Sequence, residues 1–234
     1  MPKKNKYLDF VSDEHFLECV KYVCDSYPQI STEVDMGELG ELGLDVFKMI
    51  FDINTRKITV DDWINSEVIR QADKTVSNRV GEFHQKLLGG VKGWKDLGRG
   101  HSLGIDLKND KDTIFIELKN KHNTVKGEDL KHVFDKLKRI SDQYLKAFVY
   151  YAYIIPKRPG SGERVWRTSQ REQCEQVMEA WGARVYEIVT RDKNALEKTW
   201  IALPKAVEEV LGQKSLIRKK DMKRLAEFFR QAFQ

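Results

Sequence analysis

Apolar side chains recur every three or four residues through the first third of the chain, which is the spacing of amphipathic helices. This pattern predicts a helix over 37–51. Ser12 can cap an earlier helix that runs through Val23, and Asp61 can cap a later one that ends at Gly89. We therefore expect a helical N-terminal region.

The pattern changes after the glycine-spaced segment 90–104. IDLK (105–108) and TIFIELK (113–119) have the character of two strands, and the NDKD between them is a turn sequence. The continuous apolar run AFVYYAYII (147–155) is typical of a central strand. These segments predict a β-sheet in the second half of the chain.

Helices are expected between and after these strands. One begins near Gly127. Ser169 and Glu172 form a capping box for another that ends at Trp181, and 183–189 then has the pattern of a strand. Helices close the chain. The order from residue 105 is β-β-α-β-α-β-α, which predicts an α/β fold with a mixed β-sheet flanked by helices.

Composition supports a folded, basic protein. The 234 residues are 41% hydrophobic and 10% aromatic, so a substantial core can form; we expect a helical region, 1–76, packed on a core, 77–234. The net charge of +5 suits a polyanion such as nucleic acid, and equally a basic protein without such a partner. The three cysteines lack metal-ligand spacing, and no apolar leader precedes them, so we expect reduced thiols and a cytoplasmic location. No apolar run is long enough to predict a membrane segment.

The second strand of the hairpin carries charges in an apolar setting. Side chains alternate along a strand, so Phe115, Glu117 and Lys119 share one face. If the turn has two residues, 110 and 111, Asp106 falls opposite Phe115 and joins that face. A slip of one residue would reverse the face of Asp106, so this prediction depends on the length of the turn.

Two carboxylates and an ammonium on one patch of sheet suit a Mg²⁺ site, because Mg²⁺ takes oxygen ligands. Asp106, ten intervening residues and Glu117-Leu118-Lys119 match the D…(D/E)xK pattern of nuclease active sites. Such triplets also occur at Asp129 and Asp221, in predicted helices, where they are ordinary solvated charges. The alternative for the first triplet is an edge strand with a polar face and a surface ion pair.

Five segments carry a resemblance to a known family. They are GEFHQKLLGG (81–90), GIDL (104–107), IELKNKHNT (116–124), YEIVTRDKNAL (186–196) and ALPKAVEEV (202–210). Over roughly residues 78–212 the chain resembles PD-(D/E)xK nucleases, and among them the type II restriction endonucleases that recognise GGNCC-type sites. Ile105 stands where the family usually has proline. The resemblance implies a restriction-endonuclease-like fold.

The resemblance also implies roles for individual residues. Asp106 and Glu117 would bind Mg²⁺ together with the backbone carbonyl of Leu118, and Lys119 would be the catalytic lysine. Glu82 matches the additional acidic residue that many of these nucleases hold near the site; the alternative is a solvated helix charge.

Several basic and polar residues are candidates for contact with DNA, since base reading requires side chains in a groove and orientation requires phosphate contacts. The preferred recognition loop is 156–167, and the glycine-rich segment 90–104 and the residues that follow the triplet are further candidates. The candidates are Lys157, Arg158, Arg164 and Arg167 in the loop, Lys92, Lys95 and Arg99 in the glycine-rich segment, and Lys121 and Asn123 after the triplet. Each has the alternative of a solvated surface residue, and His122 is expected to be a loop histidine.

Taken together, these features predict a Mg²⁺-dependent endonuclease that cuts double-stranded DNA at a specific site and leaves 5′-phosphates. A structure-specific or repair nuclease and an inactive nucleic-acid-binding protein of the same fold are the alternatives. A symmetric site favours a homodimer, to which the N-terminal helices could contribute. A restriction enzyme also implies a cognate DNA methyltransferase that protects host DNA.

Overall fold

The computed structural model describes residues 5–27, 44–98, 100–125, 128–168 and 171–234. By its internal contacts the chain forms two compact units, one of residues 1–24 with 80–234 and one of residues 25–79. The first helix therefore groups with the sheet, while the second unit ends close to the expected boundary between residues 76 and 77. That boundary itself stays a prediction.

The smaller unit contains α3 (Val46–Arg56) and the first part of α4 (Val60–Gly89). The Asp45 side chain caps α3 by accepting a hydrogen bond from the Lys48 backbone N–H at 2.9 Å. Trp63 is almost fully buried, and its indole N–H donates to Asp52 at 2.9 Å. The expected helix over 37–51 is thus observed in its second half, since 37–43 lies outside the described residues.

The larger unit is built on a six-stranded sheet in the order β1-β2-β3-β4-β6-β5. Strands β3, β4 and β6 are parallel, and the remaining pairs are antiparallel. The bounds are β1 Trp94–Asp96, β2 Leu107–Asn109, β3 Ile114–Lys121, β4 Phe148–Ile155, β5 Gly162–Val165 and β6 Val177–Trp181. This mixed sheet confirms the predicted α/β fold class.

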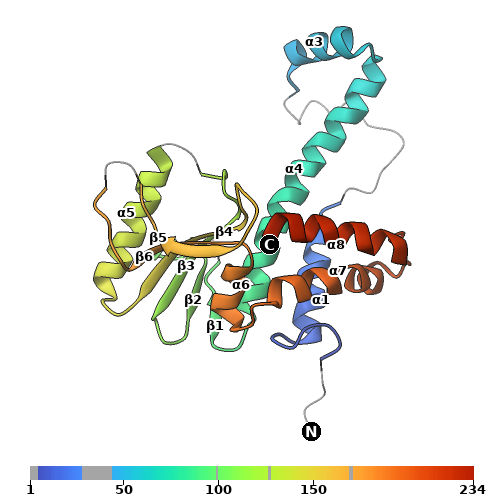
Figure 1. Cartoon of the computed structure of the whole chain (residues 1–234). Helices are drawn as coiled ribbons and strands as arrows, with labels where there is room; N and C mark the ends of the chain where they lie inside the picture. The colour runs from blue at the N-terminus through green and yellow to red at the C-terminus, as the bar shows by residue number, and fades with distance from the viewer. Residues whose placement is uncertain (1–4, 28–43, 99, 126–127, 169–170) are drawn as a thin grey trace. The chain divides into compact units, whose positions relative to one another are not determined.

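Helices cover both faces of the sheet (Figure 1). On one face, α5 (Glu128–Gln143) packs on Phe115 and Tyr151. On the other, the end of α4 and α6 (Ala183–Thr190) pack on Ile116 and Leu118. The same core takes in α1 (Asp13–Cys24), α7 (Ala195–Leu211) and α8 (Lys219–Phe233). Among the described helices, none is both long and apolar enough to cross a membrane.

Two elements predicted near residue 182 are wrong in type. The segment that ends at Trp181 was expected to be a helix, but residues 177–181 form β6, which pairs with β4 on one side and β5 on the other. Residues 183–189 were expected to be a strand and lie in α6, whose buried Val185, Tyr186 and Val189 share a helical face. Pairing partners distant in sequence outweigh the local propensity in both cases.

The expected recognition loop, 156–167, also contains a strand. Residues 162–165 form β5, which pairs antiparallel with the edge of β6, so that Arg164 lies opposite Glu179. The short length and the glycine and charge content of this segment conceal the strand from sequence patterns. The outer part of the predicted loop remains irregular, and it carries Lys157 and Arg158.

The hairpin of β2 and β3 has a longer turn than expected. Leu107 pairs with Ile116 and Lys108 with Phe115, two residues further along β3 than the predicted turn would give. Asp106 precedes these pairs, and its backbone N–H donates to the Ile116 carbonyl at 3.1 Å. The Asn109 side chain closes this turn by accepting hydrogen bonds from the backbone N–H groups of Thr113 and Ile114, at 2.9 and 3.0 Å. The shift from the predicted register is two residues, an even number, so every side chain keeps its predicted face.

Candidate active site

Strands β2 and β3 bring the predicted charged cluster together. The Lys119 Nζ lies 2.7 Å from Glu117 Oε1 and 3.8 Å from Asp106 Oδ2. Glu117 and Lys119 share a face of β3 because they are two residues apart, and Asp106 reaches the same face from the residue just before β2. The predicted grouping of these three side chains on one face is confirmed.

The Asp106 carboxylate is held in place by a backbone group of the neighbouring strand, β3. The backbone N–H of Leu118 donates to Asp106 Oδ2 at 2.6 Å, which fixes the carboxylate over β3. Burial raises the pKa of the Asp106 carboxyl above its ordinary value; the Lys119 ammonium opposes this shift and the Glu117 carboxylate adds to it. The charged cluster therefore contains a partly desolvated carboxylate whose negative charge a cation would stabilise.

A second lysine, Lys136, completes the cluster from α5. Its Nζ donates to Glu117 Oε2 at 2.7 Å and also to the carbonyl of Gly104, the residue that adopts a left-handed φ of 63° before the hairpin. Each oxygen of the nearly buried Glu117 carboxylate thus meets one ammonium group. Sequence reasoning missed Lys136, because nothing in a basic, amphipathic helix marks one lysine among several.

The residues of this cluster fit a hard divalent cation. Asp106, Glu117 and the Leu118 carbonyl offer oxygen donors, and Mg²⁺ sites commonly combine one or two carboxylates with waters and phosphate oxygens. Within the described residues no group of three or more His, Cys, Asp or Glu side chains has metal-binding geometry. The cluster accordingly suits Mg²⁺ bound jointly by protein, water and substrate, with Lys119 and Lys136 balancing the carboxylate charge beforehand.

Glu82 lies on the part of α4 that belongs to the larger unit. A Cβ on the preceding Gly81 would lie 3.4 Å from the Cβ of Asn120, so α4 passes closely by the end of β3. The Glu82 carboxylate accepts a hydrogen bond from the Tyr22 hydroxyl of α1. This contact ties Glu82 to the helical layer, and its part in catalysis stays a prediction.

The glycine-rich segment before the hairpin presents basic residues at the surface. Lys92 is exposed, and the Lys95 Nζ on β1 lies 3.3 Å from Asp110 Oδ1 in the β2–β3 turn. Arg99 lies outside the described residues. After the triplet, Lys121 and Asn123 are both exposed at the end of β3. These positions are compatible with the predicted contacts to DNA.

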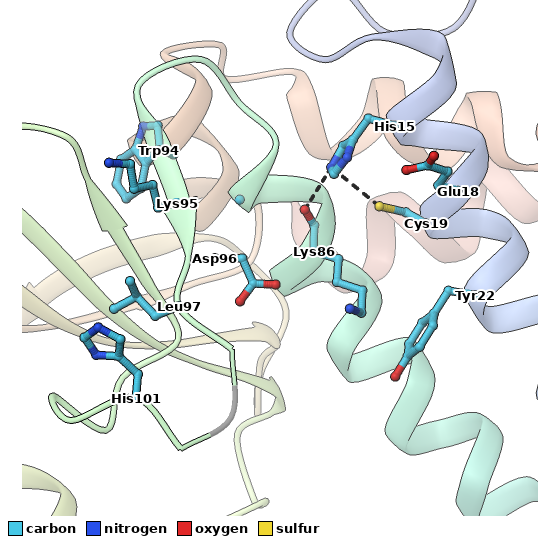
Figure 2. A pocket seen from close by; sticks show the side chains of 11 residues that line it. His15, Glu18, Cys19, Tyr22, Lys86, Trp94, Lys95, Asp96, Leu97 and His101 are labelled. Carbon is cyan, nitrogen blue, oxygen red and sulfur yellow. Dashed lines mark hydrogen bonds between the residues drawn. The ribbon is translucent and has the colours of Figure 1, made fainter.

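A cavity of about 740 Å³ lies between α1, the end of α4 and β1. Figure 2 shows His15 between the Lys86 carbonyl and the Cys19 sulfur, at 2.9 and 3.6 Å from its Nε2. Burial raises the pKa of the Cys19 thiol to about 12, so this thiol is protonated at neutral pH and is a poor nucleophile. A cysteine–histidine hydrolase site is therefore not supported here.

The arginines of the predicted recognition loop differ in their surroundings. Arg164 belongs to β5, and its Nε donates to Glu179 Oε2 at 2.7 Å. Its guanidinium lies over the Trp181 ring, 5.4 Å from the ring centroid. Lys157, Arg158 and Arg167 are exposed. Arg164 is exposed as well, but Glu179 and Trp181 hold its guanidinium against the sheet.

Comparisons with known proteins identify the family of this chain. The family described as Eco47II restriction endonuclease matches residues 8–212. The type II restriction enzyme Sau96I of Staphylococcus aureus is 32% identical over 237 aligned positions, which cover 97% of this chain and 90% of that enzyme. The type II restriction enzyme Eco47II of Escherichia coli is 36% identical over 164 positions, which cover 66% of this chain and 68% of that enzyme. The predicted resemblance is confirmed, and the chain belongs to the Eco47II restriction endonuclease family.

Proposed function

We propose that this type II restriction endonuclease hydrolyses double-stranded DNA at a GGNCC-type site, requires Mg²⁺ and leaves 5′-phosphates. The observation that supports the chemistry is the grouping of Asp106, Glu117 and Lys119 on one face of adjoining strands. The Lys119 nitrogen lies 2.7 Å from the Glu117 carboxylate and 3.8 Å from the Asp106 carboxylate. The target sequence rests on the resemblance to enzymes that recognise GGNCC-type sites.

Asp106, Glu117 and the Leu118 carbonyl would hold the cation. When bound, Mg²⁺ polarises the scissile phosphodiester and lowers the pKa of a bound water. Lys119 projects from the same face, where its ammonium can orient the attacking water and offset the charge that develops on the phosphate. The Leu118 N–H keeps Asp106 in place for this chemistry, so β3 both carries and aligns the catalytic groups.

The first test is digestion of a sequenced plasmid by the purified protein with Mg²⁺ and, in parallel, with EDTA. We expect discrete Mg²⁺-dependent fragments whose 5′-phosphorylated ends share one GGNCC-type motif. Fragments with another shared motif would retain the enzyme class and overturn the target. A preference for branched or nicked DNA would favour a structure-specific nuclease, and binding without cleavage would favour an inactive binder.

The partners form part of the proposal. A palindromic site presents the same contacts twice, so a twofold homodimer is the simplest assembly that cuts both strands. Host DNA that contains the site needs protection, for which we propose a cognate DNA methyltransferase. We propose a cytoplasmic location, because the DNA substrate and the methyltransferase would both be found there.

A further inference from the structure

A second cavity opens on the sheet beside the catalytic cluster. It has a volume of about 460 Å³, within the range of small-molecule sites. Its floor is aromatic, since Tyr151, Tyr153 and Trp166 are 2%, 8% and 4% exposed. Exposed residues of the predicted recognition loop, Lys157 and Arg158 among them, form its rim.

The strand register places this cavity next to the catalytic residues. Glu117 on β3 pairs with Tyr151 on β4, and Lys119 pairs with Tyr153. Residues directly paired across strands point to the same face, and neighbouring strands are about 4.8 Å apart. The aromatic floor therefore begins one strand away from the proposed metal ligands, within reach of the same DNA molecule.

Two polar atoms at the cavity lack partners. Among the described residues, the Tyr151 hydroxyl and His122 Nδ1 are buried side-chain atoms without a hydrogen bond. Both residues line the cavity. An unsatisfied buried hydroxyl is destabilising, because it has lost its hydrogen bonds to water. A ligand in the cavity that has hydrogen-bonding groups at its edge could supply the partners of these two atoms.

The charges of the cavity favour a ligand whose inserted part is neutral and planar and whose part outside the cavity is anionic. At the floor, buried Glu179 accepts hydrogen bonds from the Tyr153 hydroxyl at 3.0 Å and from Arg164 at 2.7 Å. A phosphate placed there would face this carboxylate. Aromatic rings instead favour stacking with a base, and the basic rim meets phosphates outside.

We propose that this cavity receives one nucleobase of the substrate, rotated out of the duplex while the neighbouring phosphate is cleaved. Stacking on the aromatic floor would offset part of the unpairing free energy, and the Tyr151 hydroxyl and His122 would bond to the base edge. This inference rests on the proposed function, because the substrate must be DNA bound at the adjoining cluster.

The test uses DNA duplexes that contain the site identified by plasmid digestion. Each position in turn carries an abasic nucleotide opposite an intact base, and binding to wild-type protein is measured in Ca²⁺. A base without a partner is extruded at lower free-energy cost, so the duplex whose intact base enters the cavity should bind about ten-fold more tightly than the fully paired one. Weaker or equal binding at every position would overturn the proposal.

Tyr151→Phe connects the effect with the cavity. It removes the unpartnered hydroxyl and keeps the ring, so affinity for the fully paired site should fall about five-fold, the factor for one hydrogen bond of ~1 kcal/mol. Tyr150→Phe is the matched control, because Tyr150 is buried on the opposite face of β4. Equal losses in the two variants, at unchanged thermal unfolding midpoints, would contradict a role for this cavity.

Adding Mg²⁺ to the same samples separates this inference from the proposed function. Cleavage of the paired site without tighter binding to any abasic duplex leaves the endonuclease in place and removes the base-binding cavity. If the plasmid digestion gives no cleaved site at all, both the proposed function and the base-binding cavity are removed, since the cavity would then have no established substrate.

Discussion

Glu117 is the residue on which the cluster depends, because its two carboxylate oxygens meet Lys119 and Lys136 at 2.7 Å each and its side chain is only 8% exposed. A buried carboxylate needs such partners, since an unpaired charge in this position would be strongly destabilising. Asp106 is more accessible and is held by one backbone N–H. Substitution of Asp106 is therefore the cleaner way to test the chemistry without unfolding the sheet.

Asp106→Asn should abolish cleavage and leave folding intact. The amide keeps an oxygen that can accept the Leu118 N–H, but it lacks the charge that holds a divalent cation. We expect cleavage to fall at least about 100-fold, since charge stabilisation by the metal contributes several kcal/mol. Plasmid cleavage in Mg²⁺ measures the loss, and binding to the same DNA confirms the fold. Wild-type cleavage by this variant would remove Asp106 from the site.

Lys136→Met should strengthen binding of Ca²⁺ or Mg²⁺ to the protein without DNA. The Lys136 ammonium competes with a cation for Glu117, and a unit charge about 3 Å away contributes ~1.4 kcal/mol even at the dielectric constant of water, which is about ten-fold in affinity. Calorimetric titration with Ca²⁺ gives the affinity directly. Lys138→Met removes the same charge from the same helix, where its partner is Asp142, and serves as the control. If Lys136→Met alone binds Ca²⁺ more weakly than the wild type, Lys136 would instead support metal binding, by keeping Glu117 in position.

At the scale of elements, the β2–β3 hairpin decides where the site forms. Its turn is closed by Asn109, whose side chain accepts from two backbone N–H groups and donates to the Thr113 hydroxyl at 2.8 Å. Asp112 within the turn has a positive φ of 52°, a conformation that aspartate tolerates better than most residues. These contacts hold the register of β2 and β3, which brings Asp106 and Glu117 to the same lysine.

Asn109→Ala should destabilise the protein by about 1–3 kcal/mol, because it leaves two backbone N–H groups of the turn without their acceptor. Urea unfolding measures the difference in the free energy of unfolding, and Asn123→Ala, an exposed residue after β3, is the control. Cleavage should fall as well, since the turn sets the position of Asp106. Unchanged stability would show that water replaces the Asn109 side chain in the turn.

At the scale of the whole molecule, the modest net charge of +5 conceals an uneven distribution. Acidic groups are engaged in the larger unit by specific partners, as Glu117 is by two lysines and Glu179 by Arg164. Exposed basic residues gather at the rim of the aromatic cavity, at Lys157 and Arg158. Attraction to DNA should therefore come from this rim more than from the overall charge.

Lys157→Ala should weaken binding to specific and nonspecific DNA alike, because a phosphate contact carries no sequence information. Each phosphate contact contributes about 0.9 to the slope of log affinity against log salt concentration, so the slope should become shallower by about one. Binding in Ca²⁺ across a series of KCl concentrations measures it, with Lys138→Ala as the control. A loss confined to the specific site would instead make Lys157 a base-reading residue.

Sequence patterns were sufficient to predict the fold class, the family and the grouping of the charged side chains. The alternation of side chains along a strand is local, so Phe115, Glu117 and Lys119 had to share a face, and Asp106 joined them because the error in turn length was an even number. The apolar run of β4 and the terminal helices followed from local patterns in the same way. Glu82 and the residues proposed for DNA contact were named from the sequence, and their roles stay predictions.

Features that depend on partners distant in sequence became visible in the three-dimensional structure. Residues 177–181 form a strand because β4 and β5 supply hydrogen bonds on both sides, and 183–189 form a helix because one helical face is buried against the sheet. Packing of α5 on the sheet brings Lys136 to Glu117. Packing of the segment after β5 brings Trp166 to the cavity that Tyr151 of β4 also lines. Local sequence carries little information about such contacts, because each residue's environment is completed by others far along the chain.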